Sequence, residues 1–206
     1  MKALLLNGSP HEQGCTYTAL CEVAGALNRE GIETEIVQVG REASGGCLAC
    51  SGCRQTGLCV RGGVLNELLP RLDEFDALVL GAPVHYASPA GEFIALLDRL
   101  FWAGGAKLRN KPGAAIVSCR RAGSTASLEV LQKYINYSHM PLVASQYWPM
   151  VHGASPEDVR RDLEGMQILR QLGRNMAWLM KCIEAGRAAG LPDPEREPAE
   201  RTNFIR

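Results

Sequence analysis

The stretch 2-KALLLNGSPHEQGCTYTALCEVAGALNR-29 decides the fold class of this chain. It starts with a short apolar run at 2–6 that predicts a buried strand, and the turn residues Asn7-Gly8 follow it. Over Thr16–Arg29 the apolar residues recur with helical spacing and form one stripe, which consists of Leu20, Val23, Ala24 and Leu27. A strand, a loop and an amphipathic helix in this order open an alternating α/β fold.

The same alternation continues to about residue 190. We expect further strands at 34–39, 75–80, 114–118 and 142–145, and helices at 124–137 and after the start signals Ser88-Pro89 and Ser155-Pro156. The helix after Ser155 is expected to be long, with an apolar stripe formed by Val159, Leu163, Met166, Leu169, Leu172, Met176, Leu179 and Ile183. Five strands that alternate with helices predict a doubly wound parallel sheet with helices on both faces.

Charge and hydropathy narrow the class of protein. The 206 residues carry 22 basic and 22 acidic side chains, and this zero net charge disfavours a nucleic-acid binder. The first apolar run is far too short for a signal peptide or a membrane span, so we expect a cytoplasmic protein with no membrane partner. In that compartment, clustered thiols are more often metal-binding or catalytic than disulfide-bonded.

Two segments fall outside the alternation of strands and helices. We expect a single domain over residues 1–190, which carries a cysteine-rich insertion at 41–63. Residues 191–206 contain several prolines and are expected to form an extended C-terminal tail. The apolar pair Phe204-Ile205 at an otherwise polar terminus suggests that the tail packs against a neighbouring copy.

The loop 7-NGSPHEQGCTYTAL-20 is a candidate anion site. In a doubly wound sheet, ligands bind beyond the carboxyl ends of the strands, where a helix N-terminus presents free N–H groups. Ser9, Thr16 and Thr18 supply hydroxyl groups, and His11 can supply charge. The loop lacks the P-loop lysine motif and the Gly-x-Gly-x-x-Gly fingerprint, so a monophosphate fits it best. The alternative is an ordinary helix cap, which uses the same residue types.

The segments Gly8-Ser9-Pro10 and Gly14-Cys15-Thr16, together with 81-GAPVHYASPAGEFIALLDRL-100, resemble the flavodoxin-like NAD(P)H-dependent flavin reductases. The resemblance spans about residues 2–150 and implies a flavodoxin-like, three-layer α/β fold with strand order 2-1-3-4-5. It also implies bound FMN, with its phosphate on the first loop and its isoalloxazine ring along the loop after the third strand. The loop 118-SCRRAGS-124 would close over the pyrimidine end of the ring.

The candidate FMN-binding residues come from these three loops. They are Ser9, His11, Cys15, Thr16, Thr18, Pro83, Val84, His85, Tyr86, Ser118, Cys119, Arg120 and Gly123. Tyr86 can stack on the ring or donate a hydrogen bond, and Arg120 or Arg121 can stabilise negative charge at the N1/O2 edge of reduced flavin. The alternatives are loop packing for His85 and Tyr86, and a solvated position for one of the two arginines. No side chain is assigned as a catalytic acid or base, since the flavin supplies the chemistry.

Four of the eight cysteines lie in 46-GCLACSGCRQTGLCV-60, with the spacing Cys47-x2-Cys50-x2-Cys53-x5-Cys59. A zinc ribbon usually separates two Cys-x2-Cys pairs by a dozen or more residues, whereas four closely spaced thiolates suit a [4Fe–4S] cluster. The spacing resembles that of the iron–sulfur flavoproteins, a branch of the same group with a cluster on an insertion after the second strand. A loop of free thiols and a zinc site are the alternatives. We expect the other cysteines to be small buried residues: Cys15, Cys21, Cys119 and Cys182.

The sequence therefore predicts an FMN-dependent oxidoreductase that takes electrons from NAD(P)H or from an electron carrier. Through FMN, and through a cluster if one is present, the electrons would reach a small-molecule acceptor or a redox protein. The alternatives are an NAD(P)H:FMN or quinone reductase without a cluster, a non-enzymatic flavodoxin-like electron carrier, and a zinc-bearing interaction module. Such carriers are usually strongly acidic, and this chain is neutral. The resemblance also implies a homodimer or a homotetramer.

Overall fold

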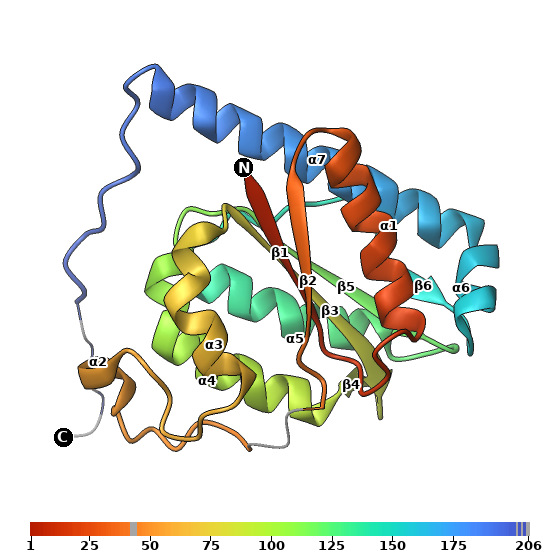
Figure 1. The fold of residues 1–206 in the computed structure, drawn as a ribbon, viewed down its shortest axis with the longest axis horizontal. Coiled ribbons are helices and arrows are strands. Elements are labelled where there is room, and N and C mark those ends of the chain that lie inside the picture. The colour runs from red at the N-terminus through yellow and green to blue at the C-terminus, as the bar shows by residue number, and fades with distance from the viewer. Residues whose placement is uncertain (42–44, 201, 203, 205–206) are drawn as a thin grey trace.

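The computed structural model describes residues 1–206 apart from 42–44, 201, 203, 205 and 206. Its central sheet contains the parallel strands β1 (Lys2–Asn7), β2 (Glu33–Gln38), β3 (Ala77–His85), β5 (Gly113–Cys119) and β6 (Met150–His152). They are ordered β2-β1-β3-β5-β6, and the two-residue strand β4 (Ser88–Pro89) pairs antiparallel with the end of β3 (Figure 1). With β4 set aside, the order of the parallel strands is the predicted 2-1-3-4-5, and the predicted doubly wound fold is confirmed.

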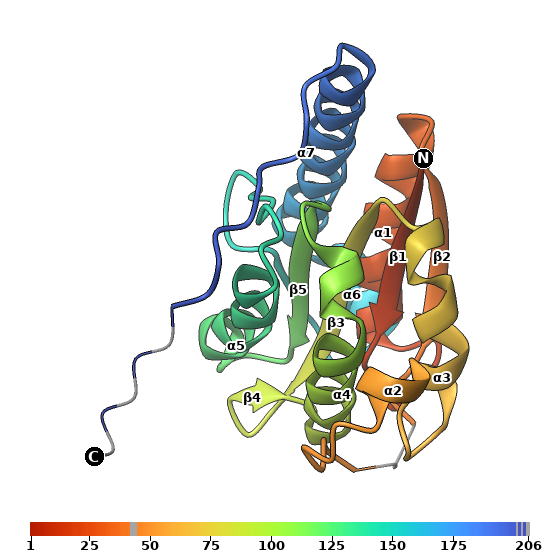
Figure 2. The same ribbon diagram turned by 90° about the vertical axis from the view of Figure 1, so that its left-hand side faces the viewer.

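Helices cover both faces of the sheet. One face carries α1 (Cys15–Arg29), α6 (Pro156–Arg161) and α7 (Leu163–Ala188). The other carries α3 (Val64–Leu68), the 3-10 helix η1 (Leu69–Glu74), α4 (Gly91–Leu108) and α5 (Ser124–Tyr137). Figure 2 shows the sheet between these two layers, with α2 (Cys53–Thr56) of the cysteine-rich insertion at the end to which β1 points.

The central strand β1 explains why the first apolar run is continuous. Leu4 and Leu6 belong to the core on the α4 and α5 side of the sheet, whereas Ala3 and Leu5 belong to the core on the α1 and α7 side. All four side chains are fully buried. A parallel strand that is covered on both faces needs apolar residues on both sides, so its sequence does not alternate.

The predicted helix start at Ser88-Pro89 is wrong. The chain turns back at Tyr86 and Ala87, which both have positive φ angles, and Ser88–Pro89 pairs antiparallel with Val84 and His85. Helix α4 begins only at Gly91. A serine followed by a proline is compatible with a helix start and also with a short edge strand, because proline suits an edge strand that donates no ladder hydrogen bond. The hairpin depends on a contact with β3 that local sequence rules do not include.

The predicted fifth strand at 142–145 is also wrong. The fifth parallel strand is β6, which pairs with Val117–Cys119 at the carboxyl end of β5. Leu142 forms only an isolated bridge with Gly113 at the other end of β5. Prolines stand at 141 and 149 on either side of the segment, and proline cannot continue a ladder of backbone hydrogen bonds.

The predicted helix start at Ser155 is correct, but the long helix is interrupted. Ser155 and Asp158 form a capping box at the N-terminus of α6, and α6 ends at Arg161. Asp162 then caps a second helix, α7, by accepting a hydrogen bond from the Gly165 backbone. Because of this interruption, Leu163 does not belong to the buried stripe as predicted, and it is 75% exposed.

The C-terminal tail has no helix or strand over residues 191–200, and its side chains there are exposed. Two polar contacts hold its first part, from Arg109 to the Pro194 carbonyl and from Arg187 to Asp193. Phe204 is exposed, and its predicted apolar neighbour Ile205 lies outside the described residues. Among the residues that the structure describes, no helix has the length and apolar character needed to cross a bilayer.

Gly173 of α7 packs closely against α1. A Cβ atom at this position would lie 2.6 Å from the Ala26 Cβ and 2.9 Å from the Val23 carbonyl oxygen. Gly186 lies in the same helix, and its nearest contact would be an ordinary 3.5 Å to the Leu191 side chain. Substitutions at the two glycines therefore distinguish the effect of close packing on stability from the effect of helix propensity.

We expect Gly173→Ala to lower the free energy of unfolding by about 1–3 kcal/mol, because the added methyl group pushes α7 away from α1. Gly186→Ala should leave this free energy unchanged or raise it by up to about 1 kcal/mol, because alanine is the better helix former. Urea unfolding followed by circular dichroism measures both. Equal effects of the two substitutions would show that α7 is not held closely at Gly173.

Glu35 of β2 is held by two basic side chains. Arg71 donates two hydrogen bonds to the carboxylate, at 3.0 and 2.8 Å, and the Lys2 ammonium lies 2.8 Å from it. The hydrogen bonds from Arg71, followed by those from Lys2, lower the pKa of Glu35 to about 2. The interaction therefore stabilises the fold above the ordinary pKa of a glutamate and is lost as the pH falls toward 2.

We expect Glu35→Gln to reduce the free energy of unfolding by about 1 kcal/mol at pH 7, as for a partly exposed ion pair. The difference from the unsubstituted chain should shrink as the pH falls from about 4.5 to about 2. Urea unfolding at a series of pH values measures it. Glu33→Gln is the matched control, since Glu33 is largely exposed and lies 3.7 Å from Lys2. If the effect of Glu35→Gln on the free energy of unfolding did not depend on pH, the lowered pKa of Glu35 would be contradicted.

Candidate functional site

The loop after β1 is held in shape by side chains at the ends of two neighbouring strands. Asn7 ends β1 and Gln38 ends β2, and the two are partners in the parallel register. Asn7 donates to the Gln38 amide oxygen at 2.6 Å and to the Glu12 carbonyl at 3.0 Å. Gln38 in turn donates to the Ser9 carbonyl at 2.6 Å. These bonds fix the loop before any ligand binds.

Two glycines allow the loop to pass between its neighbours. A Cβ atom on Gly8 would lie 2.2 Å from the ring of Phe93, and one on Gly40 would lie 2.2 Å from the Ser9 carbonyl oxygen. Real Cβ atoms do not approach other heavy atoms so closely, so neither position accepts a side chain without a shift of the backbone. The loop is therefore shaped by steric exclusion as well as by hydrogen bonds.

The predicted hydroxyl donors differ in where they point. Thr16 and Ser118 are buried, and their hydroxyl oxygens lie 2.8 Å apart, so the first loop and the end of β5 are directly joined. The Ser9 hydroxyl accepts a hydrogen bond from the His11 backbone at 3.1 Å. Thr18 donates to the Gly14 carbonyl at 3.1 Å, and this bond directs its hydroxyl into the first turn of α1.

A cavity of about 520 Å³ opens at the N-terminus of α1. It is lined by His11, Glu12, Gln13, Gly14, Cys15, Arg41, Ala154, Ser155 and Pro156. Gly14 has no side chain to cap α1, and the first N–H groups of a helix lack partners within the helix. Helix N–H groups and the Arg41 guanidinium suit a phosphate group. Arg41 itself donates to the Pro10 carbonyl at 2.8 Å.

The second predicted loop is the hairpin of β3 and β4. Pro83 and Val84 are partly buried, and His85 is exposed. Tyr86 lies at the tip with a φ of 50°, and its side chain is fully exposed. A tyrosine in the left-handed region is strained, and strain of this kind is found at ligand sites. The hairpin thus presents an aromatic ring to solvent at the carboxyl end of the sheet.

The third predicted loop touches this hairpin. Gly123 has a φ of +84°, and a Cβ atom there would lie 2.6 Å from the Ala87 Cα and 3.0 Å from a Val84 methyl group. Arg120 and Arg121 are both exposed. Cys119 is buried, and its carbonyl accepts a hydrogen bond from the Gly153 backbone at 3.0 Å. The structure therefore brings the second and third loops together at one surface.

The predicted burial of the other four cysteines holds for only part of the set. Cys119 is buried and Cys15 is half-buried, with its thiol 3.8 Å from the Gly153 carbonyl. Burial raises the pKa of both thiols above the ordinary value. Cys21 and Cys182 are exposed, which contradicts the prediction. Both lie on helix positions that face away from the sheet.

The four cysteines of the insertion line one cavity. Cys47, Cys50, Cys53 and Cys59 surround it, together with Leu48, Ser51, Val60, Arg61, Arg99, Trp102 and Ala103. Its volume is about 20 Å³. Cys47 and Cys50 are exposed, whereas Cys53 and Cys59 are half-buried. Residues that are 12 positions apart in the sequence thus meet around one point.

The backbone of the insertion supports a ligand role for these cysteines. Ala49 and Ser51, on either side of Cys50, both have positive φ angles. The Ala49 N–H points at the Cys47 sulfur at 3.4 Å, as in sites where backbone groups stabilise a thiolate. The side chain of Asn66 holds Cys59 by accepting from its N–H at 2.8 Å and donating to its carbonyl at 2.9 Å.

Four thiols are the donor set of an iron–sulfur cluster, but in this structure they are not gathered into a metal site. Among the described residues, no group of three or more His, Cys, Asp or Glu side chains is arranged to hold one metal ion. A cluster holds its thiolates further apart than one ion does, because each thiolate binds a different iron. A buried nitrogen without a partner, Arg99 Nε, also belongs to the side chains around the cavity. Four thiols beside a buried cation fit the negative charge of such a cluster.

Sequence reasoning missed at least five residues of these sites. Asn7, Gln38 and Arg41 lie at or just beyond the ends of β1 and β2, Asn66 lies on α3, and Arg99 lies on α4. Polar residues at the ends of adjacent parallel strands are a usable signal, since such ends converge at the ligand site of an open sheet. The sequence carries no comparable signal for Arg99.

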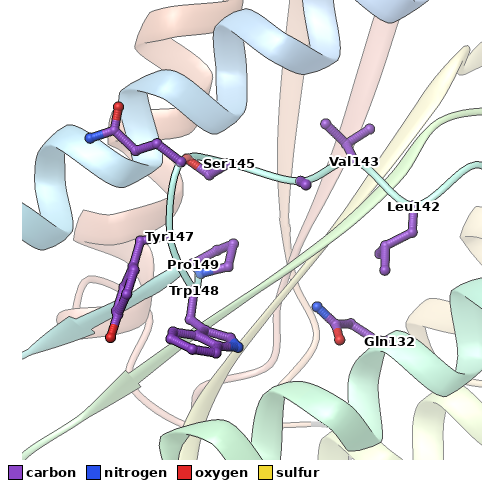
Figure 3. A pocket seen from close by; sticks show the side chains of 9 residues that line it. Gln132, Leu142, Val143, Ser145, Tyr147, Trp148 and Pro149 are labelled. Atoms are coloured by element: carbon purple, nitrogen blue, oxygen red, sulfur yellow. The ribbon is translucent and has the colours of Figure 1, made fainter.

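A separate open cavity of about 410 Å³ lies between α5 and the segment 142–149 (Figure 3). The exposed Tyr147 and Trp148 form a T-shaped pair with ring centroids 4.5 Å apart, and Gln132 faces them from α5. No residue of the three predicted flavin loops lines this cavity. It is therefore distinct from the site at the carboxyl end of the sheet.

A parallel sheet with helices on both faces, and three loops that meet at the carboxyl ends of its strands, define a protein with a flavodoxin-like fold. The chain belongs to the family of NADPH-dependent FMN reductases, whose family model matches residues 1–155. Within that family it is a flavin-dependent oxidoreductase.

Individual known proteins are similar to this chain in sequence or in fold. The chain is 28% identical over 193 residues to an iron–sulfur flavoprotein of Methanocaldococcus jannaschii, which covers 89% of this chain and 100% of that protein. Its fold is similar to that of RosB with a bound 8-demethyl-8-formylriboflavin-5'-phosphate, with a TM-score of 0.69, 18% identity, and coverage of 100% and 92% of the two chains. It is also similar to a flavodoxin from the domain Archaea, with a TM-score of 0.60, 13% identity, and coverage of 88% and 99%.

The contact between Gly123 and the β3–β4 hairpin provides a test of the flavin loops. We expect Gly123→Ala to weaken FMN binding about tenfold or more, which is about 1.4 kcal/mol, because the added methyl group separates the two loops. Quenching of FMN fluorescence on titration with apoprotein measures the dissociation constant. Gly31→Ala is the matched control, since Gly31 has a φ of +80° and open space around it. A similar loss in both variants would mean that the contact has no part in binding.

Proposed function

We propose that this chain is an iron–sulfur flavoprotein in which Cys47, Cys50, Cys53 and Cys59 hold a [4Fe–4S] cluster. The observation that carries the proposal is the single cavity that all four thiols line, with a buried arginine beside them. The similarity to the M. jannaschii iron–sulfur flavoprotein over that protein's whole length supports it. The compact spacing of the four cysteines agrees with a four-thiolate cluster site.

When bound, FMN would take two electrons from a donor such as NAD(P)H, and the cluster would exchange single electrons, so together they would link two-electron and one-electron partners. The chain's own residues bind and orient these groups. The loop at 8–15 and Arg41 would hold the phosphate, and Tyr86 and the loop at 118–124 would hold the ring. Arg120 would stabilise negative charge at the pyrimidine edge. The half-buried Cys53 and Cys59 and the exposed Cys47 and Cys50 would supply four thiolates.

The second candidate function is an NAD(P)H:FMN or quinone reductase without a cluster. One observation favours it: Cys47 and Cys50 are exposed, and the cavity between the four thiols is small. In that case the insertion would be a loop of free thiols. A flavodoxin-like electron carrier is less well supported, because such carriers are usually strongly acidic and this chain has zero net charge.

Partners and location follow from the same reasoning. We place the protein in the cytoplasm, where thiols stay reduced and cluster assembly is possible. Its electrons would come from NAD(P)H or a redox protein and go to a small-molecule acceptor or a redox protein. We also propose a homodimer or homotetramer, with the domain at 1–190 as the folding unit and the tail at 191–206 in contact with a second copy.

Anaerobic purification followed by iron and acid-labile sulfide analysis tests the cluster. We expect about four irons and four sulfides per chain, as in a [4Fe–4S] cluster. Cys59→Ser should lose most of the iron while keeping FMN, because Cys59 is the cysteine that Asn66 positions. Cys182→Ser is the control, since Cys182 is exposed on α7 and should leave the iron content unchanged.

Two results would separate the candidates. Iron near zero in the anaerobic protein, together with rapid NADH or NADPH oxidation by a quinone, would replace the proposal with the cluster-free reductase. Iron near zero without turnover would favour the electron carrier.

A further inference from the structure

Arg99 is the largest side chain that the structure buries completely, with 1% of its surface exposed. It lies on α4, one position after Asp98, which instead faces solvent and accepts a hydrogen bond from Tyr134 at 2.5 Å. A guanidinium stays charged in proteins, and a buried charge without a partner is strongly destabilising. The surroundings of Arg99 must therefore supply compensating groups.

The compensation around Arg99 is incomplete. Its Nη1 atom donates to the Gly62 carbonyl at 3.3 Å, and its Nε atom has no hydrogen-bond partner in the part of the chain that the structure describes. Across the described part of the chain, no ion pair joins Arg99 to a carboxylate, and Asp98 points elsewhere. A single carbonyl oxygen does not balance a full positive charge. Among the described residues, the guanidinium thus has spare hydrogen-bonding capacity and no carboxylate partner.

The thiol of Cys59 lies beside the Arg99 guanidinium. Its sulfur lies 4.0 Å from Arg99 Nη1, at the long limit for a hydrogen bond to sulfur. Arg99 also lines the same cavity as Cys47, Cys50 and Cys53. The guanidinium therefore reaches the four-cysteine cavity from the protein interior, opposite the solvent side on which Cys47 and Cys50 are exposed.

We propose that Arg99 is the buried counter-charge of the four-cysteine site, which donates to the Cys59 thiolate and raises the reduction potential of the group held there. This inference rests on the proposed cluster function. A positive charge and N–H donors stabilise the more negative, reduced form of a cluster, and hydrogen bonds to sulfur are a principal control of its potential. Burial strengthens the effect because little solvent screens the interaction.

A purely structural role for Arg99 is the competing explanation, in which it only supports the turn at Gly62. Loss of that support would lower thermal stability and iron content but would not shift the potential of whatever cluster remains. The potential is therefore the measurement that distinguishes the two roles.

The experiment measures the cluster's reduction potential in anaerobic protein by redox titration monitored by EPR. Arg99→Gln removes the charge, and Arg99→Lys keeps it on a different side chain. Arg54→Gln is the matched control, because Arg54 lies over the Trp102 ring at 5.4 Å but is exposed and does not line the cavity. Iron content and thermal unfolding are recorded for each variant.

We expect Arg99→Gln to disfavour one-electron reduction at least tenfold, which is a shift of about 59 mV to more negative potential. Arg99→Lys should shift it less, and Arg54→Gln should leave it nearly unchanged. An unchanged potential in a cluster-containing Arg99→Gln protein would overturn the role of Arg99 and leave the cluster function standing. Absence of iron from the unsubstituted protein would overturn both.

A second measurement decides the matter if the Arg99 variants do not fold. The unsubstituted chain is labelled with ¹⁵N in its arginines, and pulsed EPR of the reduced cluster detects nitrogen close to the unpaired spin. We expect an arginine coupling that persists in Arg61→Lys, since Arg61 is the other arginine lining the cavity. No coupling in the unsubstituted chain, or its loss in Arg61→Lys, would overturn the proposal.

Discussion

The narrow passage of the chain after β1 is the constraint on which the rest of the site depends. Gly8 lies against the ring of Phe93, and the Ser9 carbonyl lies against Gly40, with no room for a side chain at either glycine. Because the loop is pinned at these two points, the N-terminus of α1 is fixed relative to β2 and α4. That placement lets Thr16 reach Ser118 at the end of β5. A ligand at the helix N-terminus thus meets groups from three strands that are ordered in advance, which reduces the entropy lost on binding.

Much of the fold is predictable from periodicity, and the errors share one cause. Strand β1 and the stripe of α1 follow from apolar spacing, because continuous and helical patterns of burial leave a direct record in the sequence. Ser88-Pro89 and the segment 142–145 were misassigned because their structure is decided by a partner strand. Ser88 pairs with His85 across a hairpin, and the edge of β5 is taken by residues 150–152. Local signals cannot rank two partners that are distant in sequence.

The candidate site also has features that are predictable from the sequence and features that are not. Loops at strand ends are predictable because parallel strands bring their carboxyl ends together, and the spacing of the four cysteines is visible in the sequence. The hydrogen bond between Asn7 and Gln38 is not predictable from the sequence, because it depends on the register of β1 with β2. The role of Arg99 is not predictable from the sequence for a different reason. An arginine in an amphipathic helix normally lies on the solvated face, whereas Arg99 is buried and contacts Cys59 and Gly62 of the insertion.

The flavin loops and the cysteine-rich insertion differ in how far their structure is fixed without a ligand. The flavin loops are joined by hydrogen bonds and close backbone contacts that need no ligand. The insertion has no buried side chain in α2, and two of its thiols face solvent. Its order near the core comes from Asn66, which holds Cys59, and from Arg99, which holds Gly62. If the four cysteines hold a cluster, its binding would order the exposed part of the insertion, since ligand binding supplies folding free energy where the chain lacks a core. An unbalanced buried charge at Arg99 favours the same outcome, because four thiolates beside it remove the cost of leaving it unpaired.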